Sequence, residues 1–251
     1  MGSNWMIFAA AVLPVVLLLV RIYLKDKMER EPARLLIKAF LFGCLTPFAS
    51  GFISIPLGSA GFFPEAVQSL GDALRISFYG AAIPEEIAKL FFLWLLLRRC
   101  SYFDEHMDGI VYAVFVSLGF AAVENCMYLF GSGDEWLSVG VSRGLFSVPG
   151  HMGFGILMGY YYSLARFSQE RRALHRILTL VAPILAHGIY DSLLFMQEVP
   201  ALAGGLLTLL FIWFCYKLWK RGSQSIAAHL ERDAAAQKAM AEPIGDTENT
   251  L

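Results

Sequence analysis

The sequence predicts an all-α protein, a bundle of about seven helices that cross a membrane. Of its residues, 57% are hydrophobic and only 16% are charged, and the mean hydropathy is +0.57. A soluble domain normally carries about a quarter charged residues, so this composition indicates a multi-pass protein of the lipid bilayer. The net charge of −1 gives no indication of a nucleic-acid partner, and we expect none.

Seven apolar stretches are long enough to cross a bilayer, which takes about 20 helical residues. Helix breakers interrupt the second and third, among them Pro47, Gly51 and Pro84. Neighbouring helices in a membrane can satisfy the backbone groups that such residues leave free, and we expect a kink at Pro84. The predicted spans are residues 5–24, 35–56, 72–97, 108–130, 143–165, 175–196 and 201–219.

Basic residues predict the orientation of these spans. Lys and Arg gather after the first, third, fifth and seventh stretches, whereas the loops near Glu65, Asp134 and Glu198 contain none before the next span begins. Because cytoplasmic loops carry the excess of Lys and Arg, we expect the N-terminus outside and the C-terminus in the cytoplasm. The membrane domain would cover residues 1–221. A polar cytoplasmic tail would follow over residues 222–251, with a short helix near residues 226–240.

Four short polar motifs lie inside the predicted spans. An ionisable side chain in a bilayer costs at least a few kcal/mol, so such residues usually face the bundle interior and mark function. Gly155 and Gly159 also form a small-x-x-x-small pattern, which predicts close packing of the fifth helix. The motifs are Glu85-Glu86-x-x-Lys89, Phe120-x-x-x-Glu124-Asn125, His151-x-x-x-Gly155 and His187-x-x-x-Asp191.

With the predicted orientation, all four motifs lie between the middle of the membrane and its outer leaflet. The Glu pair lies about 13 residues, or about 20 Å, from the outer end of its helix. Because the four helices alternate in direction, scattered polar residues would seldom share one depth. We therefore expect one cavity to be lined by Glu85, Glu86, Glu124, His151, His187 and Asp191.

Carboxylates and imidazoles together are the groups that activate a water molecule. A carboxylate in apolar surroundings is suited to take a proton from water, and Lys89 can offset the charge of the other member of the Glu85-Glu86 pair. His187 and Asp191 are four residues apart and therefore share a helix face. The pattern predicts a hydrolytic enzyme of the membrane in which Glu85 or Glu86 activates water.

The ordered set of motifs, over about residues 80 to 195, resembles the PrsW family of intramembrane proteases, which is distantly related to the type II CAAX prenyl endopeptidases. The resemblance implies a protease of the bacterial cytoplasmic membrane whose substrate is a single-pass membrane protein, such as an anti-sigma factor. It also implies site roles for residues of this chain. Glu85 and Glu86 are the catalytic carboxylates, Glu124, His151 and His187 are further site members, and Asp191 is the partner of His187.

Two chemical mechanisms are open. In the first, Glu85 or Glu86 activates water directly, while the histidines and Asn125 hold the water or stabilise the oxyanion. In the second, Glu124, His151 and His187 bind Zn²⁺ and a carboxylate of the Glu pair is the general base, because two His with one Glu form a known catalytic zinc set. The HExxH motif is absent, and spacing alone does not decide between the two.

The alternative function is a proton-coupled transporter or channel that uses the same polar residues as a relay. A duplicated half or paired broken helices would indicate such a protein, and neither is evident in the sequence. For a protease, the outer depth of the motifs predicts a scissile bond near the extracytoplasmic end of the substrate helix.

Overall fold

The computed structural model describes residues 4–26, 29–199 and 204–241, and within these ranges the chain is almost entirely helical, without strands. This confirms the predicted all-α membrane bundle. The count of seven spans and the orientation stay predictions. Four helical segments are each long and apolar enough to cross a membrane: Asn4–Lys25 (α1), Ala33–Ser59 (α2), His106–Gly131 (α5) and Arg172–Glu198, which joins α8 (Arg172–Phe195) to the turn η4 (Met196–Glu198).

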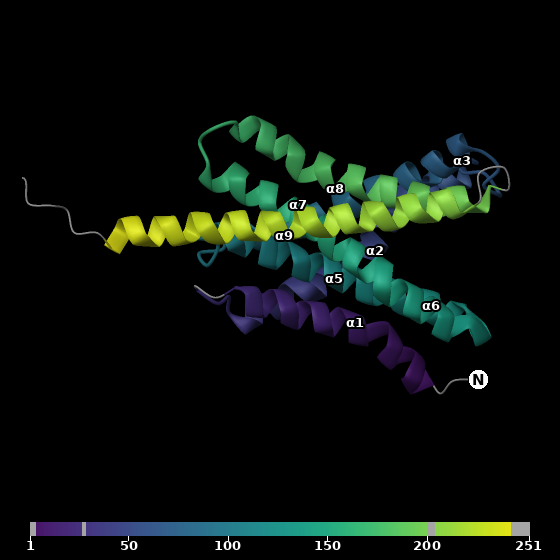
Figure 1. Cartoon of the computed structure of the whole chain (residues 1–251), viewed down its shortest axis with the longest axis horizontal. Helices are drawn as coiled ribbons and strands as arrows, with labels where there is room; N and C mark the ends of the chain where they lie inside the picture. Colours follow the sequence, from purple (N-terminus) through teal and green to yellow (C-terminus); the bar gives the residue numbers. More distant parts are fainter. Residues whose placement is uncertain (1–3, 27–28, 200–203, 242–251) are drawn as a thin grey trace, which may run out of the picture.

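The helices form an elongated bundle whose members run roughly along its long axis (Figure 1). The start of α1 lies at the same end as α3 (Leu70–Arg75) and α6 (Trp136–Ser142). The turn between α7 (Val148–Phe167) and α8 lies at the opposite end, as do the last turns of α9 (Gly205–Ala241). Successive long helices thus alternate in direction, as the sequence predicts.

Two stretches of π-helix lead into helices that carry polar motifs. α3 continues through η1 (Ile76–Ala82) into α4 (Ile83–Leu97). α6, which follows the 3₁₀ turn η2 (Gly133–Glu135), continues through η3 (Arg143–Ser147) into α7. π-helical turns are frequent at functional sites. Pro84, where we expected a kink, lies in the first turn of α4 directly after η1, a position where proline fits a helix well.

α2 stays helical through the breakers that the sequence contains. Pro47 has no N–H to donate to the carbonyl of Gly43, and the hydroxyl of Thr46 donates to that oxygen instead, at 2.6 Å. Ser50 donates in the same way to the carbonyl of Pro47, at 2.9 Å. The hydroxyl of Thr46 thus satisfies the carbonyl that Pro47 leaves free, which is one way in which membrane helices tolerate proline.

α5 is the central helix, and α1, α2 and α7 pack against it. Glycines allow this close approach. A Cβ on Gly159 of α7 would lie 2.2 Å from the carbonyl oxygen of Gly109, and a Cβ on Gly155 would lie 2.7 Å from the hydroxyl of Ser117. These contacts confirm the packing role that the small-x-x-x-small pattern predicts.

α9 is a single helix of 37 residues that joins the last predicted span to the predicted tail helix. The start of that span, at residues 201–203, lies outside the described residues. The helix continues without a break past residue 221, so the division into a membrane domain and a tail stays a prediction. Its last third docks on the bundle. The carboxylate of Asp233 accepts the backbone N–H groups of His106 and Met107 at the start of α5, and the ring of His229 stacks on Tyr160 at 4.4 Å.

Candidate active site

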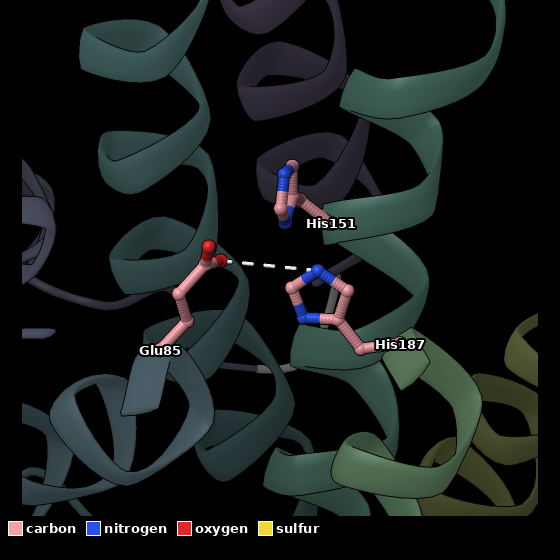
Figure 2. A group of neighbouring side chains, drawn as sticks. All are labelled: Glu85, His151 and His187. Atoms are coloured by element: carbon pink, nitrogen blue, oxygen red, sulfur yellow. Dashed lines mark ion pairs between the residues drawn. The ribbon is translucent and has the colours of Figure 1, made fainter. Parts of the chain in front are cut away.

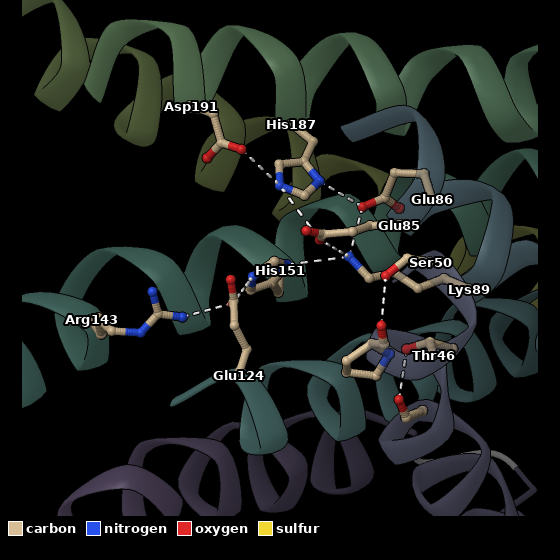
Figure 3. A network of polar contacts seen from close by, with 12 residues as sticks. Thr46, Ser50, Glu85, Glu86, Lys89, Glu124, Arg143, His151, His187 and Asp191 are labelled. Atoms are coloured by element: carbon tan, nitrogen blue, oxygen red, sulfur yellow. Dashed lines mark hydrogen bonds and ion pairs between the residues drawn. The ribbon is translucent and has the colours of Figure 1, made fainter. Parts of the chain in front are cut away.

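The structure brings the predicted site residues of four helices into one polar network (Figure 3). Their helices are packed together by the glycine contacts of α5 and α7 and by the contacts of α8 with both η1 and α7. The first turn of α4 supplies Glu85 and Glu86, α5 supplies Glu124, the first turn of α7 supplies His151, and α8 supplies His187 and Asp191.

Glu86 is fully buried and holds its neighbours in place. One of its oxygens, Oε1, accepts from the ammonium of Lys89 at 2.7 Å and contacts Nδ1 of His187 at 2.9 Å. For that contact to be a hydrogen bond, Nδ1 of His187 must carry a proton. In the neutral ring this leaves Nε2 as the nitrogen with a free lone pair, and it points toward the two other carboxylates beside it.

Glu85 differs from Glu86 in what surrounds its carboxylate. Its Oε2 lies 3.6 Å from the ammonium of Lys89 and 3.8 Å from Nε2 of His187, and it is a buried oxygen without a hydrogen-bond partner. Glu86 Oε2 is also unpartnered, but Glu86 does not line the cavity, whereas Glu85 does. Of the two adjacent carboxylates, Glu85 is therefore the one that a substrate can reach.

His151 is held from the opposite side of the network. Its Nε2 lies 2.9 Å from Oε2 of Glu124, and its Nδ1 lies 3.4 Å from the ammonium of Lys89. With the proton of the ring on Nε2, the free lone pair is on Nδ1. The other imidazole, of His187, stacks on the ring of Phe154 with the two ring centroids 4.6 Å apart, and this stacking limits the rotation of the imidazole. Both imidazoles thus have one nitrogen fixed by a carboxylate.

Arg143 belongs to the site, although we assigned it no role from the sequence. Its guanidinium donates to Glu124 at 2.7 Å and to the side-chain oxygen of Asn125 at 2.7 Å, and it lies over the ring of Tyr128 at 4.0 Å. Asn125 also donates to the carbonyl of Ala11, and it does not line the cavity. One signal in the sequence could have identified Arg143. It is the only Lys or Arg between residues 99 and 166.

The polar network opens into a cavity of about 410 Å³. Arg143, Tyr128 and Tyr190 are further residues that line this cavity. Glu124 and Asp191 contribute carboxylates to it, with side chains 20% and 17% exposed. Oδ2 of Asp191 lies 3.3 Å from Nε2 of His187, as their shared helix face predicts. With Glu85 and Glu198, the cavity therefore offers four carboxylates and two imidazoles to a bound molecule.

Glu85, His151 and His187 each offer one ligand atom within 4.8 Å of the other two (Figure 2). Zinc bonds of about 2.0–2.2 Å in a tetrahedron place ligand atoms about 3.4 Å apart, so a small shift would let these three converge on one ion. The sequence indicated a set with Glu124 in place of Glu85. In the structure Glu124 is instead the hydrogen-bond partner of the ligand candidate His151.

Comparison with known proteins gives consistent matches over most of the chain. The sequence model of a family described as "PrsW family intramembrane metalloprotease" matches residues 31–218. Protease PrsW of Bacillus subtilis (strain 168) is 38% identical over 189 residues, which cover 75% of this chain and 82% of that protein. Protease PrsW of Geobacillus kaustophilus (strain HTA426) is 35% identical over 207 residues, which cover 82% of this chain and 88% of that protein. No solved structure matches.

Proposed function

Because the chain belongs to the PrsW family of intramembrane proteases, we propose that it hydrolyses a peptide bond of a single-pass membrane protein with Glu85 as the carboxylate that meets the substrate. One observation carries this assignment: Glu85 lines the cavity with an unpartnered oxygen, whereas Glu86 is buried behind it. The family membership favours a protease over the proton-coupled transporter or channel, and no contact in the described residues favours transport.

We infer that Glu85, His151 and His187 would hold a divalent metal ion such as Zn²⁺. The donor set fits, because two His and one Glu leave the fourth position of a tetrahedral site open for water. The unpartnered oxygen of Glu85 fits as well, as do the carboxylates of Glu124 and Glu86, which hold one nitrogen of each imidazole as outer partners of metal ligands commonly do. When bound, the ion would polarise the scissile carbonyl and acidify a water molecule.

The other residues of the site would position the imidazoles and transfer the proton. Glu86, itself held by Lys89, fixes the position of His187, and Glu124 fixes that of His151. Asp191 is a cavity-facing carboxylate beside Nε2 of His187. A carboxylate in this position can accept the proton that the attacking water releases and return it to the leaving amine. Without a metal ion, Glu85 itself would take that proton, so Glu85 is required in both mechanisms.

The experiment that tests the assignment compares Glu85→Gln with Glu86→Gln. We expect the purified Glu85→Gln variant to fold and melt like the wild type and to lose cleavage of membrane substrates. Glu86→Gln should lose cleavage and also melt lower, because Lys89 would be left as a buried charge without its closest partner. Membrane proteomes of cells that express wild type or Glu85→Gln give the readout, as new N-termini. Wild-type cleavage by Glu85→Gln would show that the assignment is wrong.

Metal content separates the two mechanisms. We expect about one zinc per chain by elemental analysis of the wild type, and a loss of both metal and activity on dialysis against a chelator. The His151→Ala variant should bind none, and Asp191→Asn, which leaves the donor set intact, should keep its metal. Full activity in a protein free of metal would instead support direct activation of water by Glu85.

The substrate proposal rests on the predicted orientation and on the family. We propose that the scissile bond lies near the extracytoplasmic end of a transmembrane segment, with a membrane-anchored anti-sigma factor as the candidate substrate. A peptide bond inside an intact helix is protected by its neighbouring turns, so the segment must be extended where it enters the cavity. Mass spectrometry of the products tests the position. Cuts confined to the cytoplasmic third of the substrate helix would contradict both the orientation and the depth.

A further inference from the structure

A groove of about 590 Å³ lies between α4, α7 and α8, apart from the catalytic cavity. Ile87, Leu90, Phe91 and Trp94 form its wall on α4, with Tyr162 of α7 opposite. None of its lining residues lines the cavity that contains Glu85. The groove is therefore separate from the cavity, and its occupant has to be inferred from its own lining.

Arginines surround the end of the groove where α4 and α7 terminate and α8 begins. Arg166 of α7 and Arg176 of α8 line it directly. An adjoining hollow of about 420 Å³ shares Trp94, Tyr162 and Arg166 with the groove, and Arg98 and Arg99 also line it. In the part of the chain that the structure describes, no acidic residue lines either hollow, and none of these four arginines forms an ion pair with a carboxylate.

We propose that this groove is a binding site for one anionic phospholipid, whose acyl chain lies along α4 and whose phosphate meets Arg166 and Arg176. An acyl chain can enter an apolar groove without depriving any polar group of its hydrogen-bond partners. The guanidinium group of arginine matches the geometry of a phosphate. Basic pockets between transmembrane helices on the cytoplasmic side are known to take anionic head groups. In the predicted orientation, these arginines lie on that side.

The inner end of the groove lies close to the candidate active site, so a bound lipid would affect the packing around that site. Ile87, at that end, is the residue next to Glu86, and Thr179 and Leu180 line the groove from α8, two turns from His187. A bound acyl chain therefore lies between α4 and α8. The contact of His187 on α8 with Glu86 on α4 depends on how these two helices pack. We expect an anionic lipid to stabilise the packing of α4 against α8.

The test measures lipid binding directly and does not depend on the proposed function. Wild-type protein in detergent is titrated with phosphatidylglycerol or phosphatidylcholine and analysed by native mass spectrometry. We compare Arg166→Gln/Arg176→Gln with the control Arg171→Gln/Lys220→Gln, which removes the same charge at the same end from exposed residues outside the groove. All variants are first checked for a single size-exclusion peak.

We expect wild type to retain one phosphatidylglycerol and to prefer it over phosphatidylcholine. The groove variant should bind it about 25-fold more weakly, since each of the two arginines contributes about five-fold near a membrane surface, while the control changes little. Equal losses in the two variants would show general surface attraction and overturn the site. So would equal binding of the two lipids, displacement of the lipid by inorganic phosphate alone, or a photo-crosslinker at Leu90 that captures a substrate segment and no lipid.

Discussion

Replacement of Gly159 by alanine should separate the two helices that hold the site together. The new Cβ would lie 2.2 Å from the carbonyl oxygen of Gly109 and 2.6 Å from Cα of Ile110, both in the backbone of α5. Ordinary contact begins at 3.4 Å, so α5 and α7 must move apart by about 1.2 Å at this point. Neither neighbour is a flexible side chain that could turn away.

The same displacement reaches the active site because His151 lies two turns from Gly159 on the same helix. A shift of about 1 Å would lengthen the 2.9 Å contact between His151 and Glu124 beyond hydrogen-bond distance. Overpacking of this kind costs about 1–3 kcal/mol of stability, and a misplacement of about 1 Å can reduce catalysis about 100-fold. We therefore expect Gly159→Ala to melt lower and to cleave at least about 10-fold more slowly.

The assay is a thermal melt in detergent together with the rate of substrate cleavage. Gly131→Ala is the matched control, because a Cβ added to Gly131 of α5 would have no other atom within 4 Å, so this variant should match the wild type in both measurements. The reasoning would be refuted if Gly159→Ala kept the wild-type melting temperature and rate, since α5 and α7 would then have room that the structure does not show.

Three further predictions follow from contacts outside the glycine interface. Arg143→Gln should fold but cleave about 10- to 100-fold more slowly, because Glu124 loses the group that holds it; initial rates with circular dichroism as the folding control would show this. Burial raises the pKa of Asp26 to about 6, with the charge of Glu105 as a further cause. Ionisation in the folded state is therefore unfavourable, and stability should fall as pH rises from about 4 through 6. Asp26→Asn should flatten this dependence and raise the melting temperature at pH 7.5, and an unchanged pH profile would contradict it. Asp233→Ala should release the last third of α9, seen as faster proteolysis after residue 222, because α9 loses the carboxylate that accepts the backbone N–H groups at the start of α5.

The sequence could predict which residues meet because depth along a helix follows directly from spacing. Glu124 and His151 come from helices that run in opposite directions, and counting residues from the ends of the predicted spans is enough to place them together. The same reasoning cannot separate Glu85 from Glu86. Adjacent residues on a helix point about 100° apart, and which of them is buried depends on where α8 packs.

Other features depend on contacts that spacing does not encode. Arg143 lies at the start of a predicted span, and an arginine at the end of an apolar stretch ordinarily interacts with the membrane surface. Its role depends on Asn125 and Glu124, which are adjacent on a helix that the chain reaches 18 and 19 residues earlier. The continuity of α9 is equally hidden, because the change from apolar to polar residues near residue 221 is typical of a boundary between membrane and cytoplasm.

The π-helical stretches η1 and η3 have a consequence for insertions and deletions in this chain. A π-helical turn is wider than an α-helical one by one residue, so removing a single residue from η1 would allow an ordinary α-helix to form there. A deletion in a regular α-helix would rotate the preceding face by about 100°, but a deletion that turns the wider π turn into an α turn removes only its extra residue, so the helix faces on its two sides stay aligned. Chains that lack one residue in this segment would therefore still cross the membrane and would keep the same side chains beside Glu85.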